Sequence, residues 1–345
     1  MNLEITLLVT GGCGFIGSHF INHIYYKTNY NIINVDAMYY CASETNVLQE
    51  IRDDNKRYKL IKGNLCSYDL VNHIINDYNV SYIIHFAAQS HVQNSFEDSL
   101  QYTKDNILGT HTLLETCRKY GKIKKFIHVS TDEVYGESML PPKCTDTVQS
   151  ISTNESNGAC EEKKTEESIL CPTNPYAATK AGAELIAQSY YHSFKLPIII
   201  TRGNNVYGPN QYPEKLIPKF IKLLNENNKV TIQGNGSNIR AFLHVNDVVK
   251  AFEIILEKGE IGEIYNIGSD EEQEYTVMDV AKLLIKKIKN NDNYLQYITY
   301  IDDRPFNDKR YYISNEKIKS LGWNITIDFE HGLENMVNAG NKSNM

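Results

Sequence analysis

Two side chains near the middle of the chain have a spacing that suits proton transfer from an alcohol. Tyr176 and Lys180 stand four residues apart in a segment with a helical pattern, so they share one face of the expected helix. A free tyrosine, with a pKa of about 10, is a poor base at neutral pH. A nearby ammonium group stabilises the phenolate and lowers that pKa. Because this spacing is common by chance, its meaning depends on the surrounding scaffold.

A hydroxyl and two carboxyl groups follow one another at Thr131, Asp132 and Glu133. They come directly after an expected strand, at the edge of an α/β sheet where ligands bind. Two adjacent acids at this edge could supply one proton donor and one proton acceptor. To donate a proton near neutral pH, Asp132 must have a raised pKa, which burial beside Glu133 could supply. Standing alone, the motif would indicate only a helix cap.

A glycine-rich turn near the N-terminus indicates a dinucleotide site. Gly11, Gly14 and Gly17 allow a tight reversal from strand to helix and a close approach of the backbone to a ligand. The helix expected at residues 15–27 offers unpaired N–H groups and the positive end of its dipole to a pyrophosphate. Asp36 ends the second expected strand, where it can bind ribose hydroxyls and repel a 2′-phosphate. This arrangement favours NAD over NADP.

The composition is that of an ordinary soluble globular protein. The chain has 345 residues, of which 41% are hydrophobic and 22% charged, and its formal net charge is −7. This charge argues against general binding of nucleic acid or of an anionic membrane. The seven cysteines are scattered without a C-x-x-C pair, so we expect a cytoplasmic protein without a disulfide framework. No metal site and no membrane span are expected.

Strands and helices alternate through most of the chain. The hydrophobic pattern predicts strands at residues 5–9, 31–35, 58–61, 82–86, 125–130 and 197–201. It predicts helices at residues 15–27, 68–78, 101–120, 175–194, 214–227 and 245–257. Such alternation is typical of an α/β protein with a Rossmann-type, doubly wound parallel sheet and helices on both faces.

A change of rhythm after residue 203 predicts a second, smaller C-terminal α/β lobe that binds the substrate. We assign residues 1–203 to an NAD-binding Rossmann domain, to which 233–258 is expected to return. The substrate lobe is then formed by 204–232 and 259–337. Polar, aperiodic segments predict a surface insertion at 141–167 and a frayed tail at 338–345.

Taken together, the motifs resemble those of the extended short-chain dehydrogenases/reductases, and within them those of the NDP-sugar 4,6-dehydratases. The matching segments are residues 11–17, 86–92, 130–136, 172–180, 202–218, 234–240, 265–268 and 303–311. Phe86-Ala87-Ala88-Gln89, Arg202-Gly203-Asn204-Asn205 and Arg304-Pro305-Phe306-Asn307 most resemble the UDP-glucose 4,6-dehydratase module of plant-type rhamnose synthases. The resemblance implies NAD as the cofactor and a nucleotide-sugar as the substrate.

The resemblance further implies a three-step reaction, in which UDP-glucose becomes the 4-keto-6-deoxyglucose nucleotide of rhamnose and deoxysugar biosynthesis. Tyr176, assisted by Thr131 and Lys180, removes the proton of the carbon-4 hydroxyl while NAD takes the hydride. Glu133 then takes the carbon-5 proton, and Asp132 protonates the departing carbon-6 hydroxyl. The hydride finally returns to carbon 6, so NAD is regenerated in each cycle.

Two sets of binding residues also follow from the resemblance. Around the cofactor it places Gly11, Gly14, Phe15, Ile16, Gly17, Asp36, Asn64, Leu65, Ala87, Ala88, Gln89, Tyr176 and Lys180. Around the nucleotide-sugar it places Ser90, Thr131, Asn205, Lys215, Leu216, Arg240, Asn266, Arg304 and Asn307. Arg240 and Arg304 suit a diphosphate. Asn64 departs from the family, which commonly has an Asp there, and this departure could shift cofactor affinity but not the chemistry.

Other hypotheses share parts of this pattern. A dTDP-glucose 4,6-dehydratase would bind a base that differs by one methyl group, worth about 1–3 kcal/mol. A sugar-nucleotide 4-epimerase or a UDP-glucuronate decarboxylase could share the glycine turn and Tyr176–Lys180 but does not require Asp132 and Glu133 for dehydration. An NAD-sensing regulator would not need the Tyr176–Lys180 pair. By family analogy we expect a homodimer formed by the helices at 101–120 and 175–194, with a downstream epimerase and reductase on separate chains.

Overall fold

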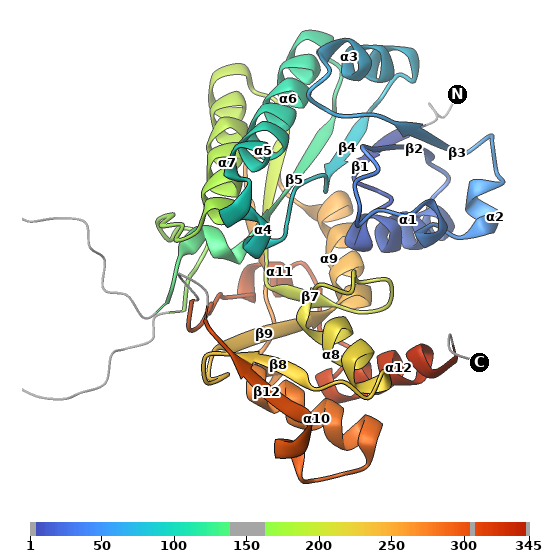
Figure 1. Cartoon of the computed structure of the whole chain (residues 1–345). Helices are drawn as coiled ribbons and strands as arrows, with labels where there is room; N and C mark the ends of the chain where they lie inside the picture. The colour runs from blue at the N-terminus through green and yellow to red at the C-terminus, as the bar shows by residue number, and fades with distance from the viewer. Residues whose placement is uncertain (1–4, 139–162, 304–307, 343–345) are drawn as a thin grey trace, which may run out of the picture.

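The computed structural model describes residues 5–138, 163–303 and 308–342 (Figure 1). Within these residues, seven parallel strands form a central sheet in the order β10-β6-β5-β4-β1-β2-β3. They are β1 (Thr6–Thr10), β2 (Asn31–Asp36), β3 (Tyr58–Lys62), β4 (Tyr82–His85), β5 (Lys125–Thr131), β6 (Ile198–Gly203) and β10 (Ile264–Ile267). The chain order reverses between β1 and β4, so the predicted doubly wound Rossmann-type sheet is confirmed.

Helices cover both faces of this sheet (Figure 1). One face carries α1 (Phe15–Lys27), α9 (Val245–Lys258) and α11 (Glu316–Ser320); the other carries α3 (Tyr68–Asp77), α6 (Gly109–Tyr120) and α7 (Pro175–Phe194). Phe20 and Phe252 fill the first interface, and Leu113 and Phe126 fill the second. The strands are rich in Ile, Val and Leu because parallel strands are buried on both sides. The short helices are α2 (Gln49–Arg52), α4 (Val92–Glu97) and α5 (Ser99–Tyr102).

A smaller lobe lies beside the carboxyl ends of the sheet strands, in the lower half of Figure 1. Its strands are β7 (Asn205–Tyr207), β9 (Ile239–His244) and β11 (Glu274–Thr276) in one sheet, and β8 (Val230–Gln233) and β12 (Ile298–Ile301) in another. Its helices are α8 (Leu216–Asn225), α10 (Val277–Lys289) and α12 (Phe329–Lys342). Phe220, Leu284 and Phe329 are buried in its own core. Short 3-10 turns occupy Glu44–Asn46, Asp132–Tyr135, Glu271–Gln273 and Tyr294–Tyr297.

Three predicted assignments differ from the structure. Of residues 233–258, expected to return to the Rossmann domain, only α9 does so, because β9 pairs with β7 and β11 in the smaller lobe. The helix expected at 101–120 is divided into α5, a π-helical turn (Thr103–Leu108) and α6, and such turns often mark functional sites. The segment 259–337, assigned to the substrate lobe, contains β10, which instead pairs with β6 at the edge of the central sheet. β10 was missed as a sheet strand because it is only four residues long and contains the polar Asn266.

Both polar segments expected to be irregular are partly ordered. Within the insertion predicted at 141–167, Lys164 pairs with Ile313 and the Glu166 carboxylate accepts the N–H of Asn266 at 2.9 Å. Residues 141–162 lie outside the described part of the chain. α12 continues to Lys342, beyond the start of the predicted frayed tail at 338. Across the described ranges, no helix combines the length and the apolar character that crossing a membrane requires.

Asp247 joins α9 to the segment that leads into α12. Its carboxylate accepts the backbone N–H groups of Thr326 and Ile327, both at 2.9 Å, and the Thr326 hydroxyl at 2.5 Å. Its carbonyl oxygen accepts the indole N–H of Trp323 at 2.9 Å. Burial alone would raise the pKa of Asp247, but these hydrogen bonds to its carboxylate outweigh burial and hold the pKa below its ordinary value.

We predict that Asp247→Ala lowers the free energy of unfolding by about 2–4 kcal/mol at neutral pH, because buried N–H groups lose their acceptor. A depressed carboxyl pKa contributes stability above the unfolded value of about 3.9, and that contribution is lost as the pH falls through the lower folded value. The difference between parent and variant should therefore shrink in acid, as measured by urea unfolding. Asp292→Ala, at an exposed site, is the control, and an equal loss there would contradict this role.

Candidate active site

The glycine-rich turn after β1 leaves no room for side chains. Gly11 has φ +71°, and a Cβ there would lie 2.8 Å from the backbone of Ala87, just after β4. A Cβ on Gly17 would lie 2.3 Å from the carbonyl oxygen of Gly11. Real Cβ atoms do not approach other atoms so closely, so only glycine fits at both positions. The turn therefore presents bare backbone to a ligand.

The first turn of α1 and the end of β2 meet at this loop. Gly14 is the N-cap of α1 and has no side chain to bind the first N–H groups, which leaves them available to a pyrophosphate. The Asp36 carboxylate accepts the N–H of Cys13 at 2.9 Å and that of Met38 at 2.8 Å. Burial raises the pKa of Asp36, and these bonds counteract the rise. The acid is thus fixed in place at the end of β2.

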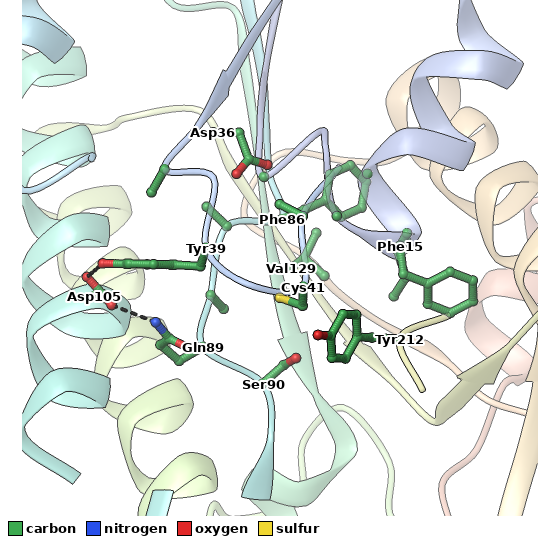
Figure 2. Close-up of a pocket in the computed structure, with 18 of the residues that line it drawn as sticks. Phe15, Asp36, Tyr39, Cys41, Phe86, Gln89, Ser90, Asp105, Val129 and Tyr212 are labelled. Atoms are coloured by element: carbon green, nitrogen blue, oxygen red, sulfur yellow. Dashed lines mark hydrogen bonds between the residues drawn. The ribbon is translucent and has the colours of Figure 1, made fainter. Parts of the chain in front are cut away.

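A single pocket extends from this loop across the carboxyl ends of β2, β4 and β5 (Figure 2). All the residues predicted to bind the cofactor line it: Gly11, Gly14, Phe15, Ile16, Gly17, Asp36, Asn64, Leu65, Ala87, Ala88, Gln89, Tyr176 and Lys180. The pocket lies where the strand order reverses, which is the usual nucleotide position in open α/β sheets. The geometry brings the predicted residues together, and their roles in binding stay predictions.

Several further residues line the same pocket without having been singled out in the sequence, among them Tyr39, Tyr40, Cys41, Asp105 and Tyr212. Asp105 accepts hydrogen bonds from Tyr39 Oη at 3.1 Å and from Gln89 Nε2 at 2.9 Å (Figure 2). Asn64 Nδ2 donates to the same carboxylate at 3.2 Å. Asp105 lies in the π-helical turn, so a regular helical pattern gave no signal for it.

Tyr176 and Lys180 lie buried on α7, one turn apart as predicted. Lys180 Nζ donates to the carbonyl oxygen of Val129 at 2.7 Å, and burial lowers the pKa of Lys180 to about 8. Burial and the charge of Glu133 raise the pKa of Tyr176 above its usual value, while a hydrogen bond with Thr131 acts in the opposite direction. The lowered tyrosine pKa expected from the ammonium is therefore not found in the protein alone, where burial and the charge of Glu133 dominate.

Asp132 and Glu133 lie in the turn that follows β5, beside Tyr176. Burial and the neighbouring Glu133 raise the pKa of Asp132 to about 7, as a proton donor at neutral pH requires. Asn204 Nδ2 donates to Asp132 Oδ2 at 2.6 Å. Burial also raises the pKa of Glu133, against a 2.8 Å hydrogen bond from Asn174 Nδ2 to Glu133 Oε2. Neither amide was singled out in the sequence.

Only some of the residues predicted to bind the substrate line this pocket. Lys215 Nζ donates to the carbonyl oxygen of Ser90 at 2.8 Å, and both residues line the pocket. The positive charge of Arg240, on β9, lowers the pKa of both acids, Asp132 and Glu133. Its guanidinium group donates to the carbonyl oxygen of Asp308 at 2.9 Å. Asn205 is exposed on β7, and Leu216 begins α8. Arg304 and Asn307 lie outside the described residues.

Asn266 does not line this pocket. It is fully buried on β10, where its Oδ1 accepts the hydroxyl of Tyr135 at 2.8 Å. Its Nδ2 donates to the carbonyl oxygen of Lys164 at 3.4 Å. The sequence did not predict this buried position, because the pattern of so short a strand does not distinguish a structural residue from one that lines a pocket. The geometry therefore favours a structural role for Asn266.

The pocket suits a dinucleotide. The Gly11 and Gly17 positions form a cradle that any Cβ would fill, and Gly14 leaves the N-terminus of α1 open to a pyrophosphate. Asp36 lies at the end of β2, where a ribose belongs in this fold. Tyr176 and Lys180 stand at the other end of the same pocket, close to the acids. The residues present thus fit NAD.

Residues 7–268 match the NAD dependent epimerase/dehydratase family, and the chain belongs to this NAD-dependent family. It is 46% identical, over 95% of its length, to the dTDP-D-glucose 4,6-dehydratase of Dictyostelium discoideum and covers 80% of that protein. It is also 46% identical, over 95% of its length, to a trifunctional UDP-glucose 4,6-dehydratase/epimerase/reductase of Arabidopsis thaliana. The chain spans about half the length of that relative, 46%.

Solved structures agree with this assignment. A dTDP-glucose 4,6-dehydratase from Streptomyces venezuelae, solved with NAD bound, superposes with a TM-score of 0.85 at 32% identity, covering 98% of this chain and 97% of that one. A UDP-glucose 4-epimerase from Thermotoga maritima has a TM-score of 0.82 at 28% identity, covering 99% and 100%. The resemblance to NDP-sugar 4,6-dehydratases predicted from the sequence motifs is confirmed.

We predict that Gly17→Ala weakens NAD binding by about tenfold or more, because a Cβ at that site displaces the Gly11 carbonyl and the pyrophosphate turn with it. Titration calorimetry with NAD measures the loss. Gly109→Ala is the matched control, since a Cβ there meets its nearest atoms at 3.6 Å, an ordinary contact. Equal affinity for NAD in Gly17→Ala and parent would exclude this role of the turn.

Proposed function

We propose that the chain is an NAD-dependent NDP-glucose 4,6-dehydratase that acts on UDP-glucose. The observation that carries this proposal is the adjacent pair Asp132 and Glu133, which lie next to the NAD pocket, close enough to Tyr176 to raise its pKa. The raised pKa of Asp132, at about 7, suits an acid that must hold a proton. The named relatives include both UDP- and dTDP-glucose dehydratases at 46% identity, so dTDP-glucose is the alternative substrate.

Tyr176 and Thr131 begin the reaction at the carbon-4 hydroxyl. Tyr176 takes the proton of that hydroxyl, and Thr131, hydrogen-bonded to it, orients the alcohol. NAD, when bound, supplies a hydride acceptor for carbon 4 and later the hydride donor for carbon 6. The positive charges of a nicotinamide ring and of Lys180 both favour the phenolate form of Tyr176, which the protein alone disfavours.

The acid pair performs the elimination. A ketone at carbon 4 makes the carbon-5 hydrogen acidic, so Glu133 can remove it as a proton. The electron pair of that bond forms the double bond between carbons 5 and 6, and the carbon-6 hydroxyl departs. Asp132 donates its proton to the departing oxygen, so water leaves rather than hydroxide. One acid must be charged and the other neutral, which two carboxyl groups sharing a buried site achieve.

The epimerase and decarboxylase hypotheses are less well supported by this site. UDP-sugar epimerases share the fold at TM-scores of about 0.82, so the fold alone does not discriminate. Neither reaction loses water across carbons 5 and 6, and neither needs an acid–base pair there. A non-enzymatic NAD sensor would have no use for the buried Tyr176 and Lys180.

We predict that incubation with UDP-glucose deuterated at carbon 4 gives a 4-keto-6-deoxy product with deuterium in the new methyl group, detected by mass spectrometry and NMR. UDP-glucose should be preferred over dTDP-glucose by about tenfold, since one methyl group in a shaped pocket is worth about 1–3 kcal/mol. Tyr176→Phe, which lacks only the hydroxyl, is the control and should give no product. Loss of the label to solvent, or inversion at carbon 4, would contradict dehydration.

We also propose a homodimer formed through the helices around α7. Large apolar side chains are exposed on neighbouring elements there: Leu100 (81%), Leu108 (48%), Leu185 (56%) and Phe194 (51%). These residues belong to α5, the π-helical turn and α7, which pack side by side (Figure 1). Exposed apolar residues gathered in this way are typical of a protein interface, and the place agrees with the helices predicted from the sequence.

We predict that Leu185→Glu raises the dimer dissociation constant about 30-fold or more, because a charge is buried where an apolar side chain packs. Sedimentation velocity over a range of concentrations measures the shift. Ile261→Glu, at a comparably exposed site before β10, is the control and should leave the dimer unchanged. A parent chain that sediments as a monomer at all concentrations would exclude the dimer.

A further inference from the structure

The two acids of the site are each bound by one buried asparagine. Asn174 donates from Nδ2 to Glu133 Oε2 at 2.8 Å, and Asn204 donates from Nδ2 to Asp132 Oδ2 at 2.6 Å. The two amides come from different elements, since Asn174 precedes α7 and Asn204 lies between β6 and β7. Both side chains are almost completely buried, with 5% and 6% of their surface exposed. Neither is explained by the catalytic steps above.

The orientation of each amide is fixed by the backbone. Asn174 Oδ1 accepts the N–H of Ala177 at 2.9 Å as the N-cap of α7, and Asn204 Oδ1 accepts the N–H of Ser269 at 2.9 Å. A backbone N–H can only donate, so the oxygen of each amide must face it. The NH2 group of each amide must then face the carboxyl group. Each acid therefore has one oxygen that serves only as an acceptor.

This restriction determines which oxygen preferentially carries a proton. When Asp132 is neutral, its hydrogen is disfavoured on Oδ2, because the hydroxyl oxygen of a carboxylic acid accepts the Asn204 N–H more weakly than a carbonyl oxygen does. The proton is therefore favoured on Oδ1, which accepts the Thr131 hydroxyl at 3.1 Å, because a hydroxyl can rotate from donor to acceptor and an amide NH2 cannot. The same hydroxyl acts on Tyr176, whose pKa it lowers, so Oδ1 is the oxygen on the side of the catalytic tyrosine. By the same reasoning Glu133 accepts a proton on Oε1.

We propose that Asn204 and Asn174 are positioning residues for the elimination step, Asn204 by fixing the proton of Asp132 on Oδ1 and Asn174 by leaving Oε1 of Glu133 as the base. This inference rests on the proposed dehydration. In that step the carbon-5–hydrogen bond breaks toward Glu133 Oε1 and its electron pair forms the carbon-5–carbon-6 double bond. The carbon-6–oxygen bond breaks, the oxygen takes the proton from Asp132 Oδ1, and water departs.

The test replaces each amide NH2 by an oxygen in a side chain of the same shape, which donates only when it is protonated. Asn204→Asp and Asn174→Asp keep the oxygen that accepts the backbone N–H, and Asp caps a helix as well as Asn does. Each new carboxyl group would share a proton with the catalytic acid and hold it on the wrong oxygen. Asn204→Ser and Asn174→Ser shorten the side chain so that its hydroxyl no longer reaches the acid, without adding a charge. Asn76→Asp, exposed on α3, controls for an added charge.

For Asn204→Asp we expect kcat with the nucleotide-sugar to fall about 10- to 100-fold with little change in KM, because one hydrogen bond to an acid is lost in the reacting complex. Oxidation at carbon 4 does not use Asp132, so the oxidised but undehydrated sugar nucleotide should be released and found by mass spectrometry. For Asn174→Asp we expect a similar fall with an enlarged kinetic isotope effect from deuterium at carbon 5. The serine variants should show the same separation of effects.

Three results decide the matter. The positioning role is overturned if both Asn→Asp variants keep the parental kcat. It is also overturned if kcat falls only in proportion to a loss of bound NAD or to a lower unfolding midpoint. The positioning role is supported if kcat falls in both variants, if the Asn204 variant releases the oxidised intermediate, and if the Asn174 variant shows an enlarged carbon-5 isotope effect. If the parent chain dehydrates neither UDP-glucose nor dTDP-glucose, the proposed function itself fails, and the amides lose this role with it.

Discussion

Two neighbouring carboxyl groups held out of water at the end of β5 are the constraint on which the site depends. Buried acids are costly unless they receive hydrogen bonds or stay protonated. Asp132 and Glu133 each receive a hydrogen bond from an asparagine, and burial raises the pKa of both. The parallel sheet makes this possible because the carboxyl ends of β4, β5 and β6 meet at one edge. Groups that are far apart in the sequence, such as Asn204 and Asp132, can then face each other.

α7 is fixed to the sheet by interactions that also position its catalytic face. Arg202 of β6 and Glu184 of α7 form a buried ion pair, and Arg202 also donates to the Tyr135 hydroxyl at 2.6 Å. Glu184 lies one helical turn beyond Lys180 and favours the charged form of that lysine against burial. At the other end, Asn174 caps α7 and binds Glu133. The helix that carries Tyr176 is thus tied to the acids and to the sheet at once.

Much of this arrangement could be predicted from local patterns. The glycine turn, Asp36 and the α7 boundaries follow from steric and capping rules, and the structure reproduces α7 as Pro175–Phe194. Asp105 could not be found, because a π-helical turn shifts the register inside a segment that looks like a regular helix. Asn174 did carry a signal, since an Asn before Pro at a helix start is a typical N-cap. Asn266 lies outside the cofactor pocket because β10 joins the central sheet beyond β6, and its predicted contact with the nucleotide-sugar stays a prediction.

The same scaffold serves epimerases, so the difference between the reactions must lie in a few groups. Oxidation at carbon 4 needs a tyrosine, a lysine and NAD, and the fold supplies that set to both kinds of enzyme. Dehydration adds a requirement for a neutral acid and a charged base within one buried site at one pH. Charge repulsion alone would let either carboxyl group hold the shared proton. Amides whose direction the backbone fixes remove part of that ambiguity, because the N–H that each donates to one carboxyl oxygen favours the proton on the other oxygen.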